Sequence, residues 1–422
     1  MPAHPSTRIL ASGLLLASLV PLLGVLDACS SGATSGPDGG AAADGATGLD
    51  GGGLPAGDVG GRADAGATDA ASPVSTPAWL AGKPKNEWFQ IPGTAGAGGS
   101  SVYAYSGMAF KNDTSEILIA LAGGHGDSAD NRVVSLRLDQ DAPAWTTRLA
   151  ASAQTERDVA YYPDGRPSAR HTYYATHYVP QVSRLMVIGA QFVYGSAVSF
   201  NTVDGFDLAT NTWDPKGTWP DTAGGFGIAQ DPTTGDVWTG SNLSVFRWSA
   251  STHQQTKVIG YNNTYLPMQN AWDPVRGRLV CIGFGDGWGY GNYPTLNAFV
   301  VSPTGEATAL TFNPSDALTQ FTADHVASAA LEYDPDHDRF LYFGGQSEQA
   351  GHGGRVYVIT PTAGTTWDVG LLPLGPGSQN PPQGPGTGVW NRFRYVPALK
   401  GLVYLPAPGW NNAPDVYFLK LD

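Results

Sequence analysis

The segment AALEYDPDHDRFLYFGG, residues 329–345, decides the fold. An apolar stretch turns at Asp334 and Pro335 and returns through a second apolar stretch that ends at two glycines. Two such stretches on either side of a turn dipeptide indicate a β-hairpin. The same pattern occurs five more times, in hairpins at 107–121, 171–188, 227–238, 270–282 and 393–405. Their turns centre on Asn112 and Asp113, Pro180, Asp231 and Pro232, Asp273 and Pro274, and Pro397.

Each hairpin is followed by a third strand, and several units show a fourth. Third strands are expected at 133–138, 203–208, 243–248, 296–301, 356–360 and 416–421, and fourth strands at Trp145, Trp213 and Trp367. Sheets that recur every ~40 to 50 residues cannot each bury both faces alone, so they are expected to stack radially. The sequence therefore predicts an all-β, six-bladed β-propeller. A seventh blade stays open, because 150–169 and 313–327 are long enough to hold irregular strands.

The last unit ends at Asp422, directly after its third strand. The segment Glu87–Ile91 reads as a strand that has no hairpin before it. We predict that this N-terminal strand becomes the outer strand of the last sheet and closes the ring.

The N-terminal residues are predicted to lie outside this fold. In residues 1–28, Arg8 precedes an apolar stretch at 9–26, which is typical of an export signal. The following Cys29 completes a sequence that resembles the bacterial lipobox, although Asp27 departs from it. We expect lipidation at Cys29 and anchoring in the cell envelope, at the outer membrane or cell surface. Ordinary secretion is the alternative.

Residues 29–78 are mostly Gly, Ala, Ser, Thr and Asp and are predicted to form a disordered tether, which leaves 79–422 for the propeller. The tether holds six Asp and one Arg, so it carries much of the chain's net charge of −13. No basic patch points to nucleic acid. Membrane contact is expected only through the lipid, and the propeller is expected to be a monomer.

Glycines at the end of the second strand and a Trp in the fourth recur in several units. These are Gly123 and Gly124 with Trp145, Gly344 and Gly345 with Trp367, and in part Gly189 with Trp213. The pattern resembles the kelch repeat and the galactose-oxidase-like propellers. Units three, four and six depart from it, so the resemblance implies a divergent member. It implies an architecture and not an activity.

In a four-stranded blade, the start of the first strand and the loop after the second lie on one face. These segments are rich in polar and aromatic residues here, so we predict that this loop-bearing face is the functional one. The residues predicted as catalytic are His125, Arg170, His171 and Tyr173. Glycines flank His125 and let its imidazole project, and a cation, a titratable ring and a phenol follow in the next unit. Alternatively, Arg170 and His171 are hydrogen-bonding residues between blades, as kelch repeats often carry.

Aromatic rings stack on sugar rings, and amides bind hydroxyl groups. Residues predicted to bind substrate on this face are Asp127, Asn131, Tyr194, Trp288, Tyr290, His325, His352, Arg392, Trp410 and Asn411. The alternative is that the Gly-rich loops pack their own aromatic residues at the rim. A polysaccharide or glycoconjugate is the predicted partner.

His, Tyr and Arg residues that converge on a propeller resemble the sites of propeller polysaccharide lyases such as the ulvan lyases. The resemblance implies that Arg170 neutralises a uronate carboxylate and that His125 or Tyr173 abstracts the adjacent proton. The alternative function is a noncatalytic scaffold that binds protein or envelope glycan.

No cofactor is predicted. The copper oxidases of this fold use a Tyr crosslinked to Cys and a Tyr–His pair, but Cys281 lies in an apolar strand and no Tyr precedes a His directly. Cys281 is predicted to be a buried hydrophobic residue. Zinc spacing is absent from the sequence. A metal site assembled only in three dimensions remains open.

Overall fold

The computed structural model describes residues 75–96, 105–189, 191–196, 198–241, 244–260, 269–284, 295–324, 329–344, 354–381, 388–406 and 415–422. The predicted signal segment, Cys29 and nearly all of the predicted tether lie outside these residues. Within them, no helix is both long and apolar enough to cross a membrane.

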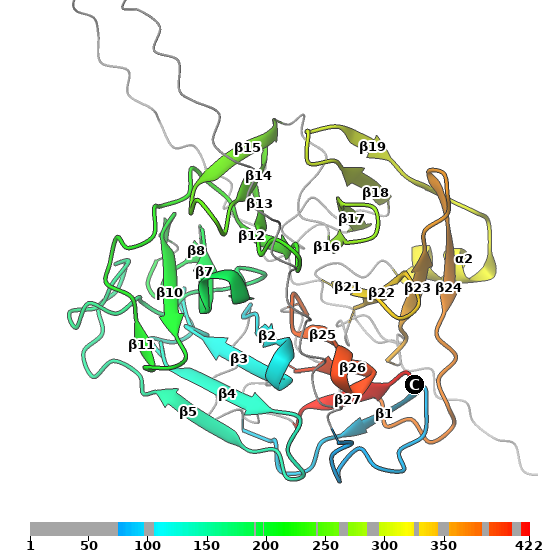
Figure 1. The fold of residues 1–422 in the computed structure, drawn as a ribbon, viewed down its shortest axis with the longest axis horizontal. Coiled ribbons are helices and arrows are strands. Elements are labelled where there is room, and N and C mark those ends of the chain that lie inside the picture. Colours follow the sequence, from blue (N-terminus) through cyan, green and yellow to red (C-terminus); the bar gives the residue numbers. More distant parts are fainter. Residues whose placement is uncertain are drawn as a thin grey trace, which may run out of the picture. The chain divides into compact units, whose positions relative to one another are not determined.

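Six antiparallel sheets are arranged around an axis in the described residues (Figure 1). From inner to outer strand, blade 1 comprises β2 (Ala109–Lys111), β3 (Glu116–Ala120), β4 (Val133–Arg137) and β5 (Trp145–Leu149). Blade 2 comprises β6 (Thr176–Val179), β7 (Arg184–Ile188), β10 (Val203–Asp207) and β11 (Thr212–Trp213). Blade 3 comprises β12 (Phe226–Gln230), β13 (Val237–Ser241), β14 (Ser244–Trp248) and β15 (Gln255–Gly260).

The remaining blades follow the same order. Blade 4 comprises β16 (Gln269–Asp273), β17 (Arg278–Phe284), β18 (Leu296–Val301) and β19 (Ala307–Ala309). Blade 5 comprises β21 (Ala330–Asp334), β22 (Arg339–Phe343), β23 (Tyr357–Thr360) and β24 (Thr366–Leu371), with β20 (Thr311–Phe312) added in parallel to β24. Blade 6 comprises β25 (Phe393–Val396), β26 (Gly401–Tyr404), β27 (Tyr417–Lys420) and β1 (Glu87–Gln90). The six-bladed propeller predicted from the sequence is thus confirmed.

Neither long segment forms a seventh blade in the described residues. Residues 150–169 contain no strand, and the second segment contains the helix α2 (Asp316–Asp324), which the sequence analysis did not predict. The Oγ of Ser315 accepts the backbone N–H of Leu318 and caps this helix. The ring of Phe321 is fully buried against Phe284 and Tyr342. The helix therefore covers the edge between blades 4 and 5.

The N-terminal strand closes the ring as predicted, because β1 pairs antiparallel with β27. Trp88 of β1 is fully buried. Its ring lies 5.3 Å from that of Phe343 in blade 5, and its Nε1 donates a hydrogen bond to the carbonyl of Gly354. Phe89 and Ile91 point the other way, into the core shared with blade 1. One short strand thus fastens blade 6 to both of its neighbours.

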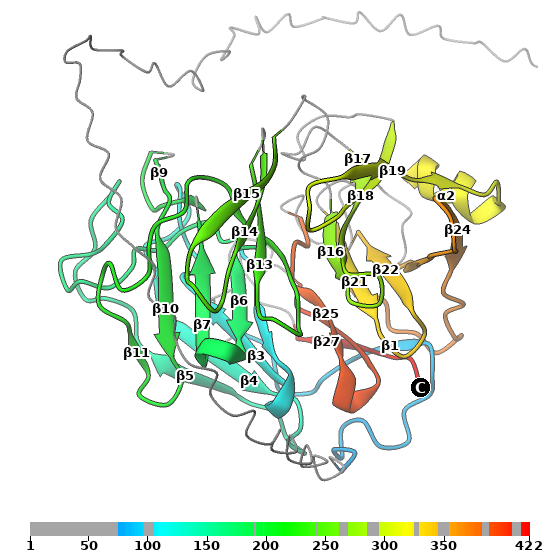
Figure 2. The same cartoon turned by 45° about the horizontal axis from the view of Figure 1, so that its top comes forward.

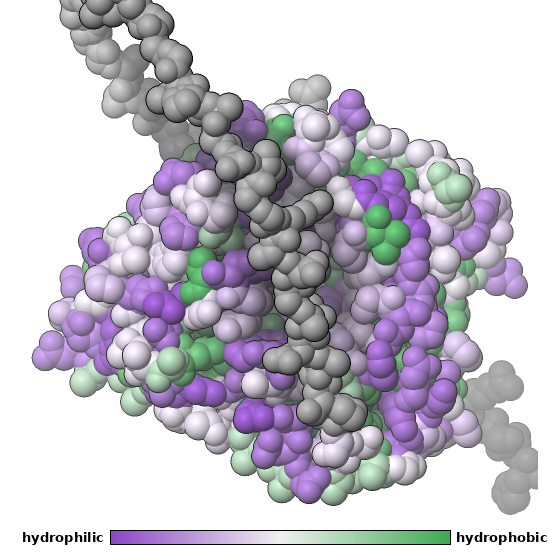
Figure 3. All heavy atoms as spheres, in the orientation of Figure 1, coloured by the Kyte–Doolittle hydropathy of each residue, from purple (hydrophilic) through white to green (hydrophobic). Residues whose placement is uncertain are grey.

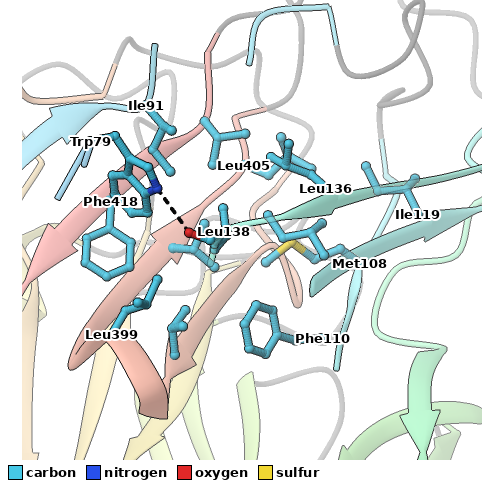
Figure 4. Packing of buried hydrophobic residues seen from close by; sticks show 14 of the residues in the cluster. Trp79, Ile91, Met108, Phe110, Ile119, Leu136, Leu138, Leu399, Leu405 and Phe418 are labelled. Atoms are coloured by element: carbon cyan, nitrogen blue, oxygen red, sulfur yellow. Dashed lines mark hydrogen bonds between the residues drawn. The ribbon is translucent and has the colours of Figure 1, made fainter. Parts of the chain in front are cut away.

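The segment before β1 also contributes to closure. Trp79 joins the buried cluster between blades 6 and 1, where it packs near Ile91 and Phe418 (Figure 4). Its Nε1 donates a hydrogen bond of 3.0 Å to the carbonyl of Leu138. The core of the propeller therefore extends upstream of its first strand.

The hairpin turns and the long loops lie on opposite faces. The six turns between first and second strands gather on the face that Figure 1 views. Figure 2 shows these turns on its lower side, with β9 (Ser199–Phe200) and α2 on its upper side. The two faces can therefore hold different sites.

Cys281 lies in β17 and is buried in the apolar core between blades 3 and 4, as predicted. Burial raises the pKa of its thiol. We expect Cys281 in a Cys29→Ser variant to resist a thiol reagent in the native protein and to react fully in concentrated guanidinium chloride. Rapid labelling under native conditions would contradict this placement.

Candidate functional site

Five side chains meet on the loop-bearing face where blades 1 and 2 adjoin, and we call them the His171 cluster: Tyr105, His125, Asp127, His171 and Tyr173. Oδ2 of Asp127 lies 2.6 Å from Nε2 of His171, and the Tyr173 hydroxyl lies 3.3 Å from Nδ1. The His171 ring is 4.8 Å from the ring of Tyr105 and 5.6 Å from that of His125. Three of the four predicted catalytic residues are therefore together.

The backbone is left-handed at three members of the cluster: Tyr105, His125 and Tyr173 have φ values of 60°, 40° and 44°. Non-glycine residues hold this conformation at a cost of order 1–3 kcal/mol each, and such residues concentrate at functional sites. At Gly124, φ is 99° and an added Cβ would lie 2.4 Å from the backbone of Arg170. The glycines beside His125 were predicted to let its imidazole project. Gly124 also permits the close approach of blades 1 and 2.

The loop after β7 passes through the cluster and fixes its backbone. It contains β8 (Gln191–Phe192), which pairs with β9. The N–H of His171 donates to the carbonyl of Phe192, and the N–H of His125 donates to that of Val193. The second of these hydrogen bonds joins blade 1 to blade 2 at the site.

The cluster forms a phenol–imidazole–carboxylate chain that runs from the interior to the surface. His171 and Tyr173 are buried, whereas Asp127 is exposed. With Nε2–H donating to Asp127, Nδ1 of a neutral His171 accepts the hydroxyl proton of Tyr173. Transfer of that proton would leave an imidazolium paired with the carboxylate, which is the logic of a triad. Nδ1 of His125 is buried and has no hydrogen-bond partner among the described residues.

Arg170 is not placed as a catalytic residue would be, and it fits the alternative prediction of a hydrogen-bonding residue. Its guanidinium is fully buried, ion-paired with Asp204 at 3.2 Å and hydrogen-bonded to Thr202 and to the carbonyls of Ser168 and Ala160. It is held between segments of the protein and cannot meet a substrate carboxylate. Arg170 and His171 are adjacent in the sequence, but their side chains point in different directions. Adjacency therefore does not bring Arg170 into the His171 cluster.

Two predicted binding residues are also buried. Asn131 donates hydrogen bonds to Ser152 and to the carbonyl of Pro167. Arg392 donates to the backbone of its own turn, and burial lowers its pKa to about 10. Both side chains are structural, because neither reaches the surface.

Tyr194 is half-buried and forms an isolated β-bridge with His125. The exposed guanidinium of Arg157 lies 5.3 Å from the centre of its ring. Arg157 therefore provides a cation beside the His171 cluster. Arg157 could not be placed from the sequence, because residues 150–169 carry no strand pattern.

Trp288, Tyr290, His325, His352, Trp410 and Asn411 lie outside the described residues. Among the residues that are described, no three His, Cys, Asp or Glu side chains are grouped as metal ligands would be.

Neither a protein-family model nor a curated protein matches the sequence. Solved structures with a similar fold include a chain of a mitotic checkpoint complex, with 11% identity, a TM-score of 0.42, and coverage of 80% of this chain and 96% of that one. TolB from Acinetobacter baumannii has 13% identity, a TM-score of 0.38, and coverage of 69% and 60%. A fungal alcohol oxidase in complex with copper has 13% identity, a TM-score of 0.43, and coverage of 79% and 75%. Similarity at this level carries no information about activity.

Proposed function

We propose that this protein is an exported propeller, lipid-anchored at Cys29, that binds a polymeric carbohydrate and cleaves a uronate-containing polysaccharide by elimination. The observation that carries the proposal is the hydrogen-bonded chain from Tyr173 through His171 to Asp127. Tyr105 beside the chain and Tyr194 nearby are aromatic rings suited to stacking on sugars. The segments that follow β17 and β26 in the sequence, outside the described residues, contain Trp288, Tyr290, Trp410 and Asn411, which are predicted to bind the polymer.

In the proposed reaction, Tyr173 is the base, which the sugar reaches at the small part of this residue that stays exposed (7%), and Arg157 binds the uronate carboxylate. Tyr173 passes its hydroxyl proton to His171, whose positive charge is offset by Asp127. The phenolate removes the proton on the carbon next to the carboxylate, and that electron pair forms the C=C bond as the C–O bond to the leaving sugar breaks. The leaving oxygen then takes this proton from Tyr173. The His171 imidazolium returns its proton to the Tyr173 phenolate, which restores both residues. The step consumes neither water nor a cofactor.

We expect Tyr173→Phe to lower the elimination rate by about 10²- to 10⁴-fold, because it removes the general base. Asp127→Asn should lower the rate as well, because it removes the charge that stabilises the imidazolium. The assay is ultraviolet absorbance of the unsaturated product over a panel of uronate polymers. The control is Tyr417→Phe, whose hydroxyl contacts Gln90 in the outer strands of blade 6.

A noncatalytic binding scaffold is the second candidate. Two observations favour it. Arg170 and Arg392 are buried. Both ring nitrogens of His171 already have partners. No product from any polymer, together with unchanged glycan binding in His125→Ala, would favour the scaffold over the lyase.

A further inference from the structure

A cavity opens on the turn-bearing face, opposite the His171 cluster. It has a volume of about 470 Å³ and is lined by the first strands and hairpin turns of all six blades. Prolines of five turns stand around it: Pro180, Pro232, Pro274, Pro335 and Pro397. Figure 3 views this face, whose visible surface is largely hydrophilic with small hydrophobic patches. Cavities of ~300–1,000 Å³ hold single small molecules.

Aromatic residues separate this cavity from the His171 cluster. Tyr174 and Trp390 line it, with their ring centres 5.3 Å apart. Tyr173 contacts the same Trp390 at 5.0 Å. Asn391 accepts the N–H of Met108 and donates to the carbonyls of Tyr174 and Thr176, which ties three blades together at this level. The cavity is therefore a distinct site.

Among the described residues that line the cavity, Arg394 is the only Lys or Arg. Its Nε lies 3.4 Å from Oε1 of Glu332, and 28% of its side chain is exposed. That oxygen also accepts the N–H of Tyr395 at 2.9 Å. Among the described residues, the guanidinium of Arg394 makes no hydrogen bond. Nε is buried against Glu332, so a ligand would meet the two Nη groups at the exposed end of the side chain.

The other described walls provide flat rings, the carboxylate of Asp113 and no second Lys or Arg. Trp272, Tyr333 and Tyr178 line the cavity as aromatic surfaces. His177 also lines it, and burial together with the nearby Arg394 lowers its pKa to about 3, so the ring is neutral at physiological pH. A single guanidinium among aromatic walls matches a ligand with one anionic group on a flat body.

We propose that this cavity binds a small organic carboxylate that carries an aromatic or similarly flat ring. The carboxylate pairs with Arg394, because a guanidinium binds a carboxylate through two parallel hydrogen bonds. The ring lies against the aromatic walls. Glu332 competes for the same guanidinium, so it weakens binding and keeps the ligand exchangeable.

The test compares benzoate, 4-hydroxyphenylacetate and indole-3-acetate with their neutral amides, by isothermal titration calorimetry on the full chain. We expect at least one acid to bind at least about tenfold more tightly than its amide. Arg394→Gln should weaken that acid by a similar factor, whereas Glu332→Gln should tighten its binding. Arg247→Gln is the matched control, because Arg247 lies on β14 with only an exposed ion pair to Asp236.

Equal affinities for acid and amide, or the absence of saturable binding by all three acids, would overturn the proposal. Undiminished binding to Arg394→Gln would overturn it as well. If Arg394→Gln does not fold, the acid–amide comparison on the unaltered chain and the Glu332→Gln variant still decide. Failure here leaves the polymer-cleavage assay unaffected, because the cavity and the His171 cluster lie on opposite faces.

Discussion

Replacing Trp88 with Ala is expected to lower the free energy of unfolding by about 3–5 kcal/mol. The indole is fully buried between blades 5 and 6, where it contacts the rings of Phe343, Phe393 and Tyr404. Its removal leaves a cavity at the position where the N-terminal strand closes the ring. The measurement is urea denaturation followed by far-ultraviolet circular dichroism.

Val275→Ala is the control for this prediction, since Val275 is 64% exposed in a hairpin turn and should change stability by no more than about 0.5 kcal/mol. A loss below about 1 kcal/mol in Trp88→Ala would show that β1 is not an integral part of the last blade. A drop in the denaturant slope, with a second transition, would instead show that blade 6 unfolds separately.

The repeated hairpins made the architecture predictable, because the strands of most blades follow one another closely in the sequence. Even the closing strand could be recognised. Glu87–Ile91 is a strand that belongs to no hairpin, and the last unit lacks a fourth strand. The helix α2 was missed because nine residues with a single buried aromatic at Phe321 give little helical periodicity.

The candidate site was predictable only in part. His125 and His171 were placed on one face because both follow the blade pattern, but the 5.6 Å between their rings could not be derived from the sequence. A structural role for Arg170 was one of two alternatives, and the sequence could not decide between them because the partner Asp204 lies 34 residues away on another strand. The cavity at Arg394 was missed for a related reason. A short turn gives no sign of a binding site in the sequence. The turns become the rim of a cavity only when the ring closes.

Arg170→Met is expected to lower the free energy of unfolding by about 3–5 kcal/mol, because removing one partner of a buried ion pair leaves the other charge uncompensated. Asp204 would keep its hydrogen bonds from Tyr161 and Thr202 but lose its cation. The carbonyls of Ser168 and Ala160 would lose donors too. Thermal and urea denaturation measure the change.

Arg184→Met is the matched control, because Arg184 pairs with Asp207 and Asp214 at the surface and should cost no more than about 1 kcal/mol. The double variant Arg170→Met, Asp204→Leu should recover part of the stability lost in Arg170→Met, since it removes the unpaired charge as well. Polysaccharide cleavage separates the structural role from the catalytic one. If Arg170 acts through the fold, activity in the double variant follows the fraction of folded protein. A stable Arg170→Met protein that has lost all cleavage would instead restore Arg170 to the catalytic set.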